Sequence, residues 1–266
     1  MISFLTRSAV AADLAALGLR AGDMVMVHAG MRAVGPLLNG PDALIDALRD
    51  VVGPDGTIMA YAYWDTQHEG LLDQHGRVLA AWRDHVPPFD AAGSRAARNH
   101  GAFVECLRTT TGAFRSANPS ASMVAIGAKA DWLTRDHAQD YGYGPGSPLA
   151  RLVSAGGRVL IVGAPHSKLT LLHLAEHLAD IPGKHVVRYE VPFATPTGTE
   201  WRMIEEFETD EPVTDTLSVD GFERIVDAFL AQGHGATGKI GNAPATLVDA
   251  APMLAFGIAW IEAQHG

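Results

Sequence analysis

The chain has 266 residues, of which 47% are apolar and 19% are charged, a composition typical of a globular protein with a substantial core. Its formal charge of −10, from 30 acidic and 20 basic residues, disfavours nucleic acid and anionic membranes as partners and favours a cationic ligand. The single cysteine, Cys106, excludes an internal disulfide framework and a multi-cysteine zinc site, and its amphipathic surroundings favour a buried structural thiol.

The N-terminal region lacks the features of a targeting segment. Residues 1–23 contain no apolar core of a secretory signal, and Asp13 interrupts the mildly hydrophobic run. No stretch reaches the ~20 consecutive apolar residues that span a bilayer. We therefore expect a soluble, cytoplasmic protein without a membrane partner, and a homodimer is compatible with the sequence.

The first elements alternate between helix and strand. Residues 9–19 and 41–52 have the apolar spacing of helices, and Gly22 is expected to close the first. Residues 24–30 and 57–64 are continuous apolar runs, typical of buried strands. This alternation indicates an α/β fold, and a right-handed crossover would place both strands in one sheet.

Residues 65–100 form a long polar and aromatic segment with little periodicity. Long irregular stretches inside compact domains are usually binding loops or lids. A disordered insertion is the alternative, but the aromatic residues Trp64, Trp82 and Phe89 argue against it. We therefore predict an insertion that contributes to a substrate site.

The rest of the chain continues the mixed pattern. We predict helices over 101–110, 170–180, 220–231 and 250–264, and strands over 122–127, 158–163 and 186–193. No internal repeat or low-complexity linker interrupts them. The prediction is a single domain over 1–266, with an α/β architecture in which helices flank a mixed central sheet.

Several common enzyme motifs are absent from the sequence. It contains no GxxxxGK[ST] phosphate loop, no GxGxxG fingerprint after a strand, no GxSxG nucleophile elbow and no HExxH zinc helix. These absences argue against the corresponding nucleotide-binding, hydrolytic and metalloprotease classes.

A histidine pair lies on the predicted helix 170–180. His173 and His177 are four residues apart, the spacing of two metal ligands on one helix face, although a metal would need a further ligand from elsewhere. Alternatively, His173 is a general base, because the ordinary histidine pKa near 6.5 suits proton removal at neutral pH. Glu176 could then fix its tautomer. A purely structural core histidine is the third interpretation, and spacing alone leaves the choice open.

Acidic residues cluster at 205–212, in the sequence EEFETDEP. Such a run is usually a solvated charged loop. Alternatively, several of these carboxylates converge on bound ammonium groups, where each charge-assisted hydrogen bond contributes about 1.5–3 kcal/mol.

Taken in order, several segments resemble the aminoglycoside 3-N-acetyltransferase family. They are GDMVMVHAG at 22–30, PPFD at 87–90, FRSANPSASMVAIG at 114–127, YGPGSPLARL at 143–152 and GGRVLIVGAPHSKLTLLHLAEHLADIPGK at 156–184. Their order and spacing make the resemblance specific, and it covers nearly the whole chain. It implies that family's fold, and acetyl transfer from acetyl-coenzyme A to the 3-amino group of aminoglycosides, which gives antibiotic resistance.

The resemblance also implies site residues and a mechanism of direct attack in a ternary complex, without an acetyl-enzyme and without a metal. His173 matches the histidine of the family's TxLHxAE helix and is implied to be the catalytic base, with Glu176 beside it. The implied coenzyme-binding residues are Met31, Arg32, Ala33, Val34, Gly35, Arg115, Ser116, Gly163, Ala164 and Thr170, of which the arginines are expected to pair with phosphates. The implied aminoglycoside-binding residues are Tyr63, Trp64, Asp65, Asp90, Glu206 and Glu208.

The sequence departs from the family pattern at two positions. Asn118 stands in RSANP where RSxHP is usual, and Gly30 stands in HAG where serine is usual. Both positions lie near the expected coenzyme site. They either alter coenzyme contacts or mark a branch with a different acceptor.

Three other functions are compatible with these residues. An acyltransferase of the same family acting on another amine would bind coenzyme A without turning over aminoglycosides. A metal-dependent hydrolase would use His173, His177 and a carboxylate. A non-catalytic protein would sequester a cationic ligand without consuming acetyl-coenzyme A.

Overall fold

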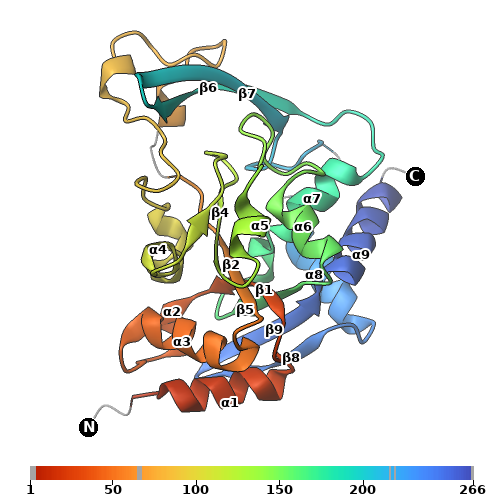
Figure 1. Cartoon of the computed structure of the whole chain (residues 1–266). Helices are drawn as coiled ribbons and strands as arrows, with labels where there is room; N and C mark the ends of the chain where they lie inside the picture. The colour runs from red at the N-terminus through yellow and green to blue at the C-terminus, as the bar shows by residue number, and fades with distance from the viewer. Residues whose placement is uncertain (1–3, 65–67, 216, 219, 265–266) are drawn as a thin grey trace.

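A seven-stranded mixed sheet forms the centre of the computed structural model, which describes residues 4–64, 68–215, 217–218 and 220–264 (Figure 1). Its strand order is β3-β4-β2-β1-β5-β9-β8. The strands are β1 Met24–Ala29, β2 Thr57–Tyr61, β3 Phe114–Arg115, β4 Met123–Gly127, β5 Arg158–Val162, β8 Ala236–Ile240 and β9 Ala243–Asp249. The predicted fold class is confirmed.

The three central strands, β2, β1 and β5, run parallel. Their continuous apolar sequences are buried almost throughout, as expected for strands covered on both faces. The predicted placement of the first two strands in one sheet is confirmed, with Met24 paired to Thr57. The outer strands β3, β4, β9 and β8 join by antiparallel pairing.

Helices cover both faces of the sheet. The first layer holds α1 Arg7–Leu17, α2 Met31–Val34, α3 Gly40–Val52 and α4 Ala102–Thr109, and the second holds α5 Ala130–Thr134, α6 Pro148–Ser154, α7 Leu171–Leu178, α8 Gly221–Ala231 and α9 Ala250–Ala263. Alternate side chains of β1 serve the two layers, since Val25 and Val27 pack with the first and Met24 and Met26 with the second. Each layer therefore has its own apolar core.

Helix α1 ends earlier than the sequence suggested. Its C-cap is Gly18, which has a φ of 110°, and not Gly22. The amide of Gly18 donates to the carbonyl of Ala15, so the chain turns out of the helix one turn before the predicted stop.

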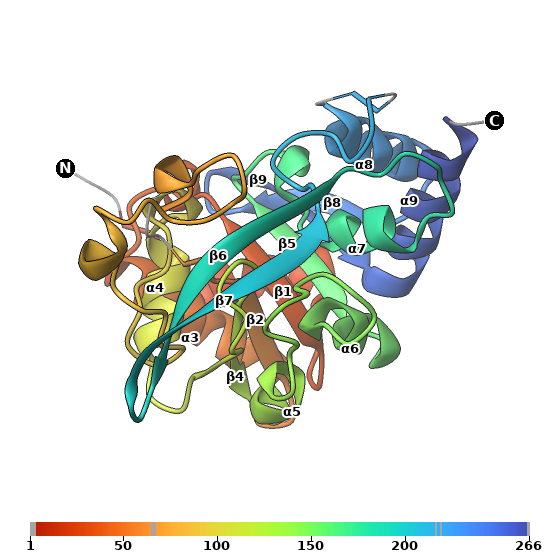
Figure 2. The same ribbon diagram turned by 90° about the horizontal axis from the view of Figure 1, so that it is seen from above.

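A separate two-stranded ribbon crosses over one end of the sheet (Figure 2). It consists of β6 Val186–Thr195 and β7 Gly198–Phe207, joined by a tight turn. The sequence predicted a strand over 186–193 but not its partner β7. Together with the insertion, the ribbon covers the end of the sheet at which β2 ends.

The described part of the predicted insertion, residues 68–100, contains short 3-10 turns at His68–Leu71, Arg83–His85 and Arg98–His100. It packs on the ribbon through a small apolar core of Trp64, Phe89, Val191, Phe193 and Ile204. The amide of Phe89 donates to the carbonyl of Pro192 at 2.7 Å, and Ala194 returns a bond to Phe89 at 2.9 Å. The insertion thus gains a backbone partner in the ribbon.

Within the described part of the chain, no helix combines the length and the apolar character that crossing a membrane requires.

Candidate active site

Helix α7 carries a hydrogen-bonded histidine–carboxylate pair. Nδ1 of His173 lies 2.8 Å from Oε2 of Glu176, and the two side chains are 19% and 6% exposed. Burial raises the pKa of Glu176, while the bond with His173 opposes that rise. Since Nδ1 is engaged, Nε2 is the ring nitrogen of His173 that is left to exchange a proton with a ligand.

Aromatic rings hold the imidazole of His173 from two directions. The ring centroid of Tyr143 lies 4.9 Å from it at 44°, and that of Phe222 lies 4.9 Å from it at 62°. The histidine is therefore fixed by packing as well as by its bond with Glu176.

The second histidine of the helix, His177, has different neighbours. Its Nδ1 lies 2.8 Å from the hydroxyl of Tyr141, and its ring packs against Tyr141, Tyr143 and Phe207. Burial lowers the pKa of His177 to about 3, so it is neutral near pH 7. Across the described ranges, no group of three or more His, Cys, Asp or Glu residues is placed to hold a metal ion.

A cavity of about 390 Å³ lies between the ribbon, the insertion and the end of β2. It is lined by Tyr61, Tyr63, Leu72, Asp73, Gln74, Gly76, Ser120, Tyr143, Val187, Arg188, Tyr189, Glu206, Phe207, Glu208, Thr209 and Asp210. Four carboxylates and four tyrosines are among these residues. Such a lining suits a polar, cationic ligand with flat ring surfaces.

Glu206 is the buried carboxylate of this cavity. It accepts hydrogen bonds from the amide of Gly142 at 3.0 Å and from the hydroxyl of Ser120. Burial raises its pKa, although those hydrogen bonds and the nearby His173 lower it in part. Glu208 accepts from the amides of Thr209 and Asp210, which hold its carboxylate at the cavity rim.

The predicted acceptor residues separate into two groups. Tyr63, Glu206 and Glu208 line the cavity. Trp64 is buried and packs on Phe89 in the core of the ribbon, with ring centroids 5.4 Å apart. Asp90 caps its own turn by accepting from two following amides, and neither it nor Trp64 lines the cavity. The predicted Asp65 lies outside the described residues.

Two predicted coenzyme segments pack closely together at the ends of β1 and β5. The amide of Gly30 donates to the carbonyl of Val162 at 2.8 Å. A Cβ atom on Gly30 would lie 2.0 Å from the carbonyl oxygen of Gly163, so this backbone leaves no room for a side chain. Glycine at position 30, where the family usually has serine, therefore fits the tight contact between the two loops.

The remaining coenzyme residues surround this contact. Met31, Arg32, Ala33 and Val34 form the short helix α2, Gly35 ends it, and Ala164 follows Gly163. Val34 is fully buried, whereas the side chain of Arg32 is exposed. Thr170 lies directly before α7 and is largely buried. These segments share the edge of the sheet where parallel strands end, which is a common place for ligands.

Arg115 and Ser116 face the interior of the protein. The guanidinium of Arg115 donates to the carbonyls of Ala62 and Ser94 and to the hydroxyl of Ser122, and burial lowers its pKa to about 10. The hydroxyl of Ser116 accepts from the amide of Met123 at 2.9 Å. Internal partners thus occupy both side chains, and their coenzyme contacts stay predictions.

The second departure, Asn118, has a structural explanation. Its Oδ1 accepts from the amide of Ala121 at 2.7 Å and lies 3.1 Å from the hydroxyl oxygen of Ser120, while its Nδ2 donates to the carbonyl of Ala138 at 2.8 Å. Asn118 is fully buried. It therefore shapes the turn that presents Ser120 to Glu206.

Sequence reasoning missed several residues that line the cavity. Tyr61 lies two positions before Tyr63, so strand periodicity could have found it, and their rings stack with centroids 6.3 Å apart. Tyr143 opens the motif YGPGSPL but was assigned no role. Ser120 carries no local signal, because only the turn at Asn118 brings it to the cavity.

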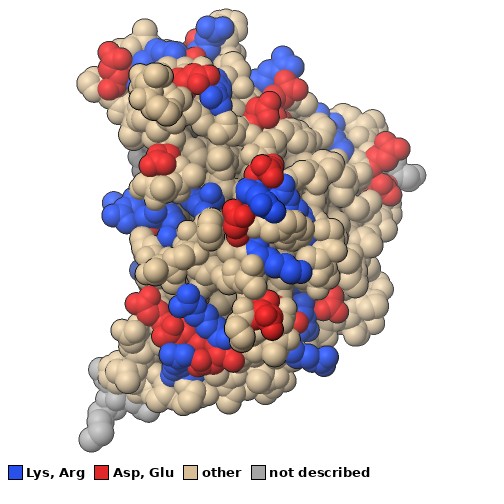
Figure 3. Space-filling view, in the orientation of Figure 1, with Lys and Arg blue, Asp and Glu red and all other residues tan. Residues whose placement is uncertain are grey.

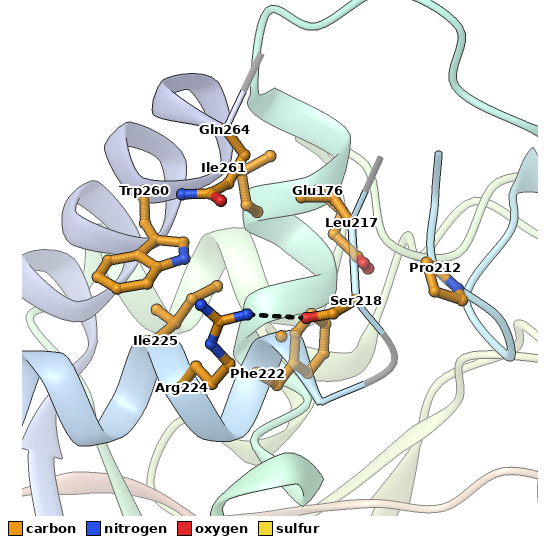
Figure 4. A pocket seen from close by; sticks show the side chains of 11 residues that line it. Glu176, Pro212, Leu217, Ser218, Phe222, Arg224, Ile225, Trp260, Ile261 and Gln264 are labelled. Carbon is orange, nitrogen blue, oxygen red and sulfur yellow. Dashed lines mark hydrogen bonds between the residues drawn. The ribbon is translucent and has the colours of Figure 1, made fainter. Parts of the chain in front are cut away.

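Glu176 also lines a second, smaller cavity, of about 80 Å³, between α7, α8 and α9 (Figure 4). Phe222 and Arg224 of α8 and Trp260 of α9 form parts of its wall. The carboxylate that orients His173 thus borders this pocket as well as the histidine.

The family profile described as aminoglycoside 3-N-acetyltransferase matches residues 26–262. An aminoglycoside N(3)-acetyltransferase III of Pseudomonas aeruginosa is 43% identical over 251 residues, which cover 94% of this chain and 91% of that protein. An aminoglycoside N(3)-acetyltransferase VIII of Streptomyces fradiae is 44% identical over 266 residues, which cover 98% of this chain and 93% of that protein.

Solved structures give the same result. A structure of AAC-IIIb in a binary complex with CoASH superimposes with a TM-score of 0.98 at 61% identity, covering 99% of this chain and 98% of that one. A structure of AAC-VIa bound to sisomicin gives a TM-score of 0.94 at 39% identity, covering 99% of this chain and 100% of that one.

Proposed function

The chain belongs to the aminoglycoside 3-N-acetyltransferase family, and we propose on that basis that it transfers the acetyl group of acetyl-coenzyme A to the 3-amino group of aminoglycosides. The observation that supports this most is the His173–Glu176 hydrogen bond, next to Tyr143, which lines a cavity that also carries four carboxylates. The reaction would take place in the cytoplasm and confer antibiotic resistance.

In the proposed mechanism both substrates are bound at once. The coenzyme lies at the loops of Met31–Gly35 and Gly163–Ala164, and the acceptor lies in the cavity. Nε2 of His173 takes a proton from the acceptor ammonium, directly or through water. The free amine then attacks the thioester carbonyl and forms a carbon–nitrogen bond. The carbon–sulfur bond breaks, the imidazolium of His173 protonates the departing thiolate, and the new amide nitrogen loses its extra proton to water, so coenzyme A leaves as the free thiol. Backbone N–H groups near the first loop stabilise the oxyanion.

The carboxylates of the cavity supply positioning. An aminoglycoside carries several ammonium groups, and Glu206 and Glu208 would bind those that do not react. Each charge-assisted hydrogen bond of this kind contributes about 1.5–3 kcal/mol. Holding these groups orients the reactive amine and lowers the entropic cost of the attack.

A direct test combines an acceptor panel with a substitution of the base. The protein is incubated with acetyl-coenzyme A and aminoglycosides that include gentamicin, and thiol release and product mass are measured. We expect a product heavier by one acetyl group, with fragmentation placing it at the 3-amino group. His173→Ala should lower kcat by about 10²–10⁴-fold while coenzyme binding is retained. Wild-type turnover in that variant would contradict the assignment of the base.

A second candidate function is acetyl transfer to another amine by the same machinery. The departures at Gly30 and Asn118 motivate it, although both have local structural explanations. Coenzyme binding without thiol release across the aminoglycoside panel would favour this alternative.

A further inference from the structure

Tyr143 belongs at once to the acceptor cavity and to the surroundings of the base. Its side chain lines the cavity, and its ring lies 4.9 Å from that of His173 at an interplanar angle of 44°. The residue is 97% buried, because only 3% of its surface is exposed. One aromatic ring therefore contacts both the space for the acceptor and the imidazole that would deprotonate it.

A chain of hydroxyl groups fixes the orientation of this ring. The hydroxyl of Tyr143 donates to that of Tyr61 at 2.8 Å, and Tyr61 donates to the carbonyl of Ser120 at 2.9 Å. The hydroxyl of Ser120 in turn donates to Glu206. Tyr143 is thus connected, through two residues, to the buried carboxylate of the acceptor cavity.

The backbone before Tyr143 is anchored to the same carboxylate. The amide of Gly142 donates to Glu206 at 3.0 Å, and Nε2 of His137 donates to the carbonyl of Gly142 at 2.6 Å. A Cβ atom on Gly142 would lie 2.4 Å from that of Ala121, so the close approach requires glycine. Both the backbone and the hydroxyl of this segment therefore hold Tyr143 in place.

Tyr143 is not itself suited to proton transfer. Burial and the neighbouring Tyr61 raise its pKa well above that of an ordinary tyrosine, so its hydroxyl stays protonated. What the ring contributes is a fixed surface. Displacement of a reacting group by about 1 Å can lower a rate by ~10²-fold, so such a surface has a direct kinetic effect.

We propose that Tyr143 is a positioning residue, whose fixed ring packs on the imidazole of His173 and sets its distance and angle to the amine of an acceptor bound in the adjoining cavity. This inference rests on the proposed function of His173. It gives the YGPGSPL motif a role in the reaction, as the link between acceptor binding and the base.

The test is a double-mutant cycle on the full chain, with gentamicin as acceptor and the product quantified by mass. Tyr143→Leu removes the ring and should lower kcat by about 10²-fold, with the Kd for coenzyme A within about 2-fold of the wild-type value. Tyr143→Phe keeps the ring and should recover most of the rate, with a loss of about 2- to 10-fold from the missing hydrogen bond. Tyr141→Phe is the matched control, since its hydroxyl bonds to His177, and it should leave kcat unchanged.

The cycle separates positioning from a general loss of structure. If Tyr143 acts through His173, adding Tyr143→Leu to His173→Ala should cause little further loss of kcat. Multiplicative losses would overturn the inference, as would wild-type kcat in Tyr143→Leu. If His173→Ala itself keeps wild-type turnover, the proposed role of His173 as base is refuted. If His173→Ala is inactive but Tyr143→Leu keeps wild-type turnover, only the proposed role of Tyr143 is refuted.

Discussion

Three described histidines are held uncharged inside the protein. Burial lowers the pKa of His28 to about 3, that of His137 to about 4 and that of His177 to about 3. His137 has the most complete set of partners, because its ring nitrogens contact the hydroxyl of Ser116 at 2.9 Å and the carbonyl of Gly142 at 2.6 Å. The carbonyl of Gly142 can only accept, so Nε2 carries the proton and Nδ1 accepts from Ser116; protonation of Nδ1 would remove that acceptor.

These histidines should make the protein less stable in mild acid. Because their folded-state pKa values lie below the unfolded value near 6.5, the unfolded chain binds more protons than the folded chain as the pH falls. Their contribution is complete above pH 6.5 and is lost toward pH 4, at up to about 1.4 kcal/mol per pH unit for each histidine. The raised pKa values of Glu176 and Glu206 act in the opposite direction, because the folded chain takes up their protons before the pH has fallen to the ordinary glutamate value of 4.5.

Substitution of His137 isolates one such contribution. Glutamine can donate to Gly142 and accept from Ser116 but does not titrate, so His137→Gln should flatten the dependence of unfolding free energy on pH by about one proton between pH 6.5 and 4. Urea denaturation across this range measures the slope. The exposed His85→Gln provides a control with the wild-type slope, and an unchanged slope in His137→Gln would contradict the prediction.

The sequence specifies only part of the site at the level of single residues. Helical spacing predicted that His173 and Glu176 share a face, and their hydrogen bond confirms this pairing. Tyr143 was missed because its position depends on a loop that folds back onto α7, and no local periodicity encodes that contact. Asp90, which the family resemblance implies to be an aminoglycoside-binding residue, is engaged with the amides of its own turn.

At the level of elements, a buried carboxylate fastens the insertion to the ribbon. Glu190 of β6 accepts from the amide of Val78 at 3.2 Å and from Arg83 at 2.5 Å, and the guanidinium of Arg83 lies 4.3 Å from the ring of Trp201 on β7. The amide of Glu190 also donates to the carbonyl of Gly76 at 2.7 Å. The insertion and the ribbon are therefore held together by charge as well as by their apolar core.

Removal of the Glu190 carboxylate should weaken the attachment of the insertion to the ribbon, which together cover the cavity. In Glu190→Ala the amide of Val78 and the guanidinium of Arg83 lose their acceptor, which costs about 1–3 kcal/mol. We expect a lower unfolding free energy, faster proteolysis within residues 72–96 and a higher KM for the acceptor. Glu200→Ala, at an exposed position of the same ribbon, is the control and should show none of these effects. Equal proteolysis of the two variants would argue against a fastening role.

The ribbon also shows where element prediction from sequence failed. Residues 186–193 were predicted as a strand, but β7 was missed because the acidic run at its end resembles a solvated loop. Burial of Ile204 and Glu206 on β7 depends on the insertion and on Ser120, both distant in sequence. The long-range partners, and not the local pattern, stabilise this strand.

At the level of the whole molecule, charge matters for the encounter with a cationic acceptor. The formal charge is −10, and acidic and basic side chains alternate over the face drawn in Figure 3. Attraction to a polycationic aminoglycoside should therefore be long-ranged and weakened by salt. We expect kcat/KM for gentamicin to fall by about 10-fold between low and high salt, through KM rather than kcat.

The salt effect has a simple control. Coenzyme A is an anion, so its Kd should not weaken in parallel if attraction to the acceptor is the cause. Steady-state kinetics at several NaCl concentrations, combined with calorimetry for coenzyme A, measure both quantities. Salt-independent kcat/KM would show that local contacts alone determine acceptor capture.

The sequence predicted the α/β architecture and the placement of two central strands in one sheet. Alternation of helix and strand over the first 64 residues predicted that β1 and β2 lie in one sheet, and the structure pairs them directly. The antiparallel strands β8 and β9 were not predicted, because glycines at 235, 238 and 241 interrupt the apolar pattern of the C-terminal region. Their place in the sheet is set by pairing with β5.

The lone thiol of the chain bears on how turnover can be followed. Cys106 lies on α4, half-buried, and burial together with the nearby Asp42 and Glu105 raises its pKa. Little thiolate is present near pH 7, so a chromogenic disulfide reagent should react slowly with the protein and rapidly with released coenzyme A. A continuous colorimetric assay can thus run on the unmodified chain, and a slow, saturating background of one equivalent would mark the titration of Cys106.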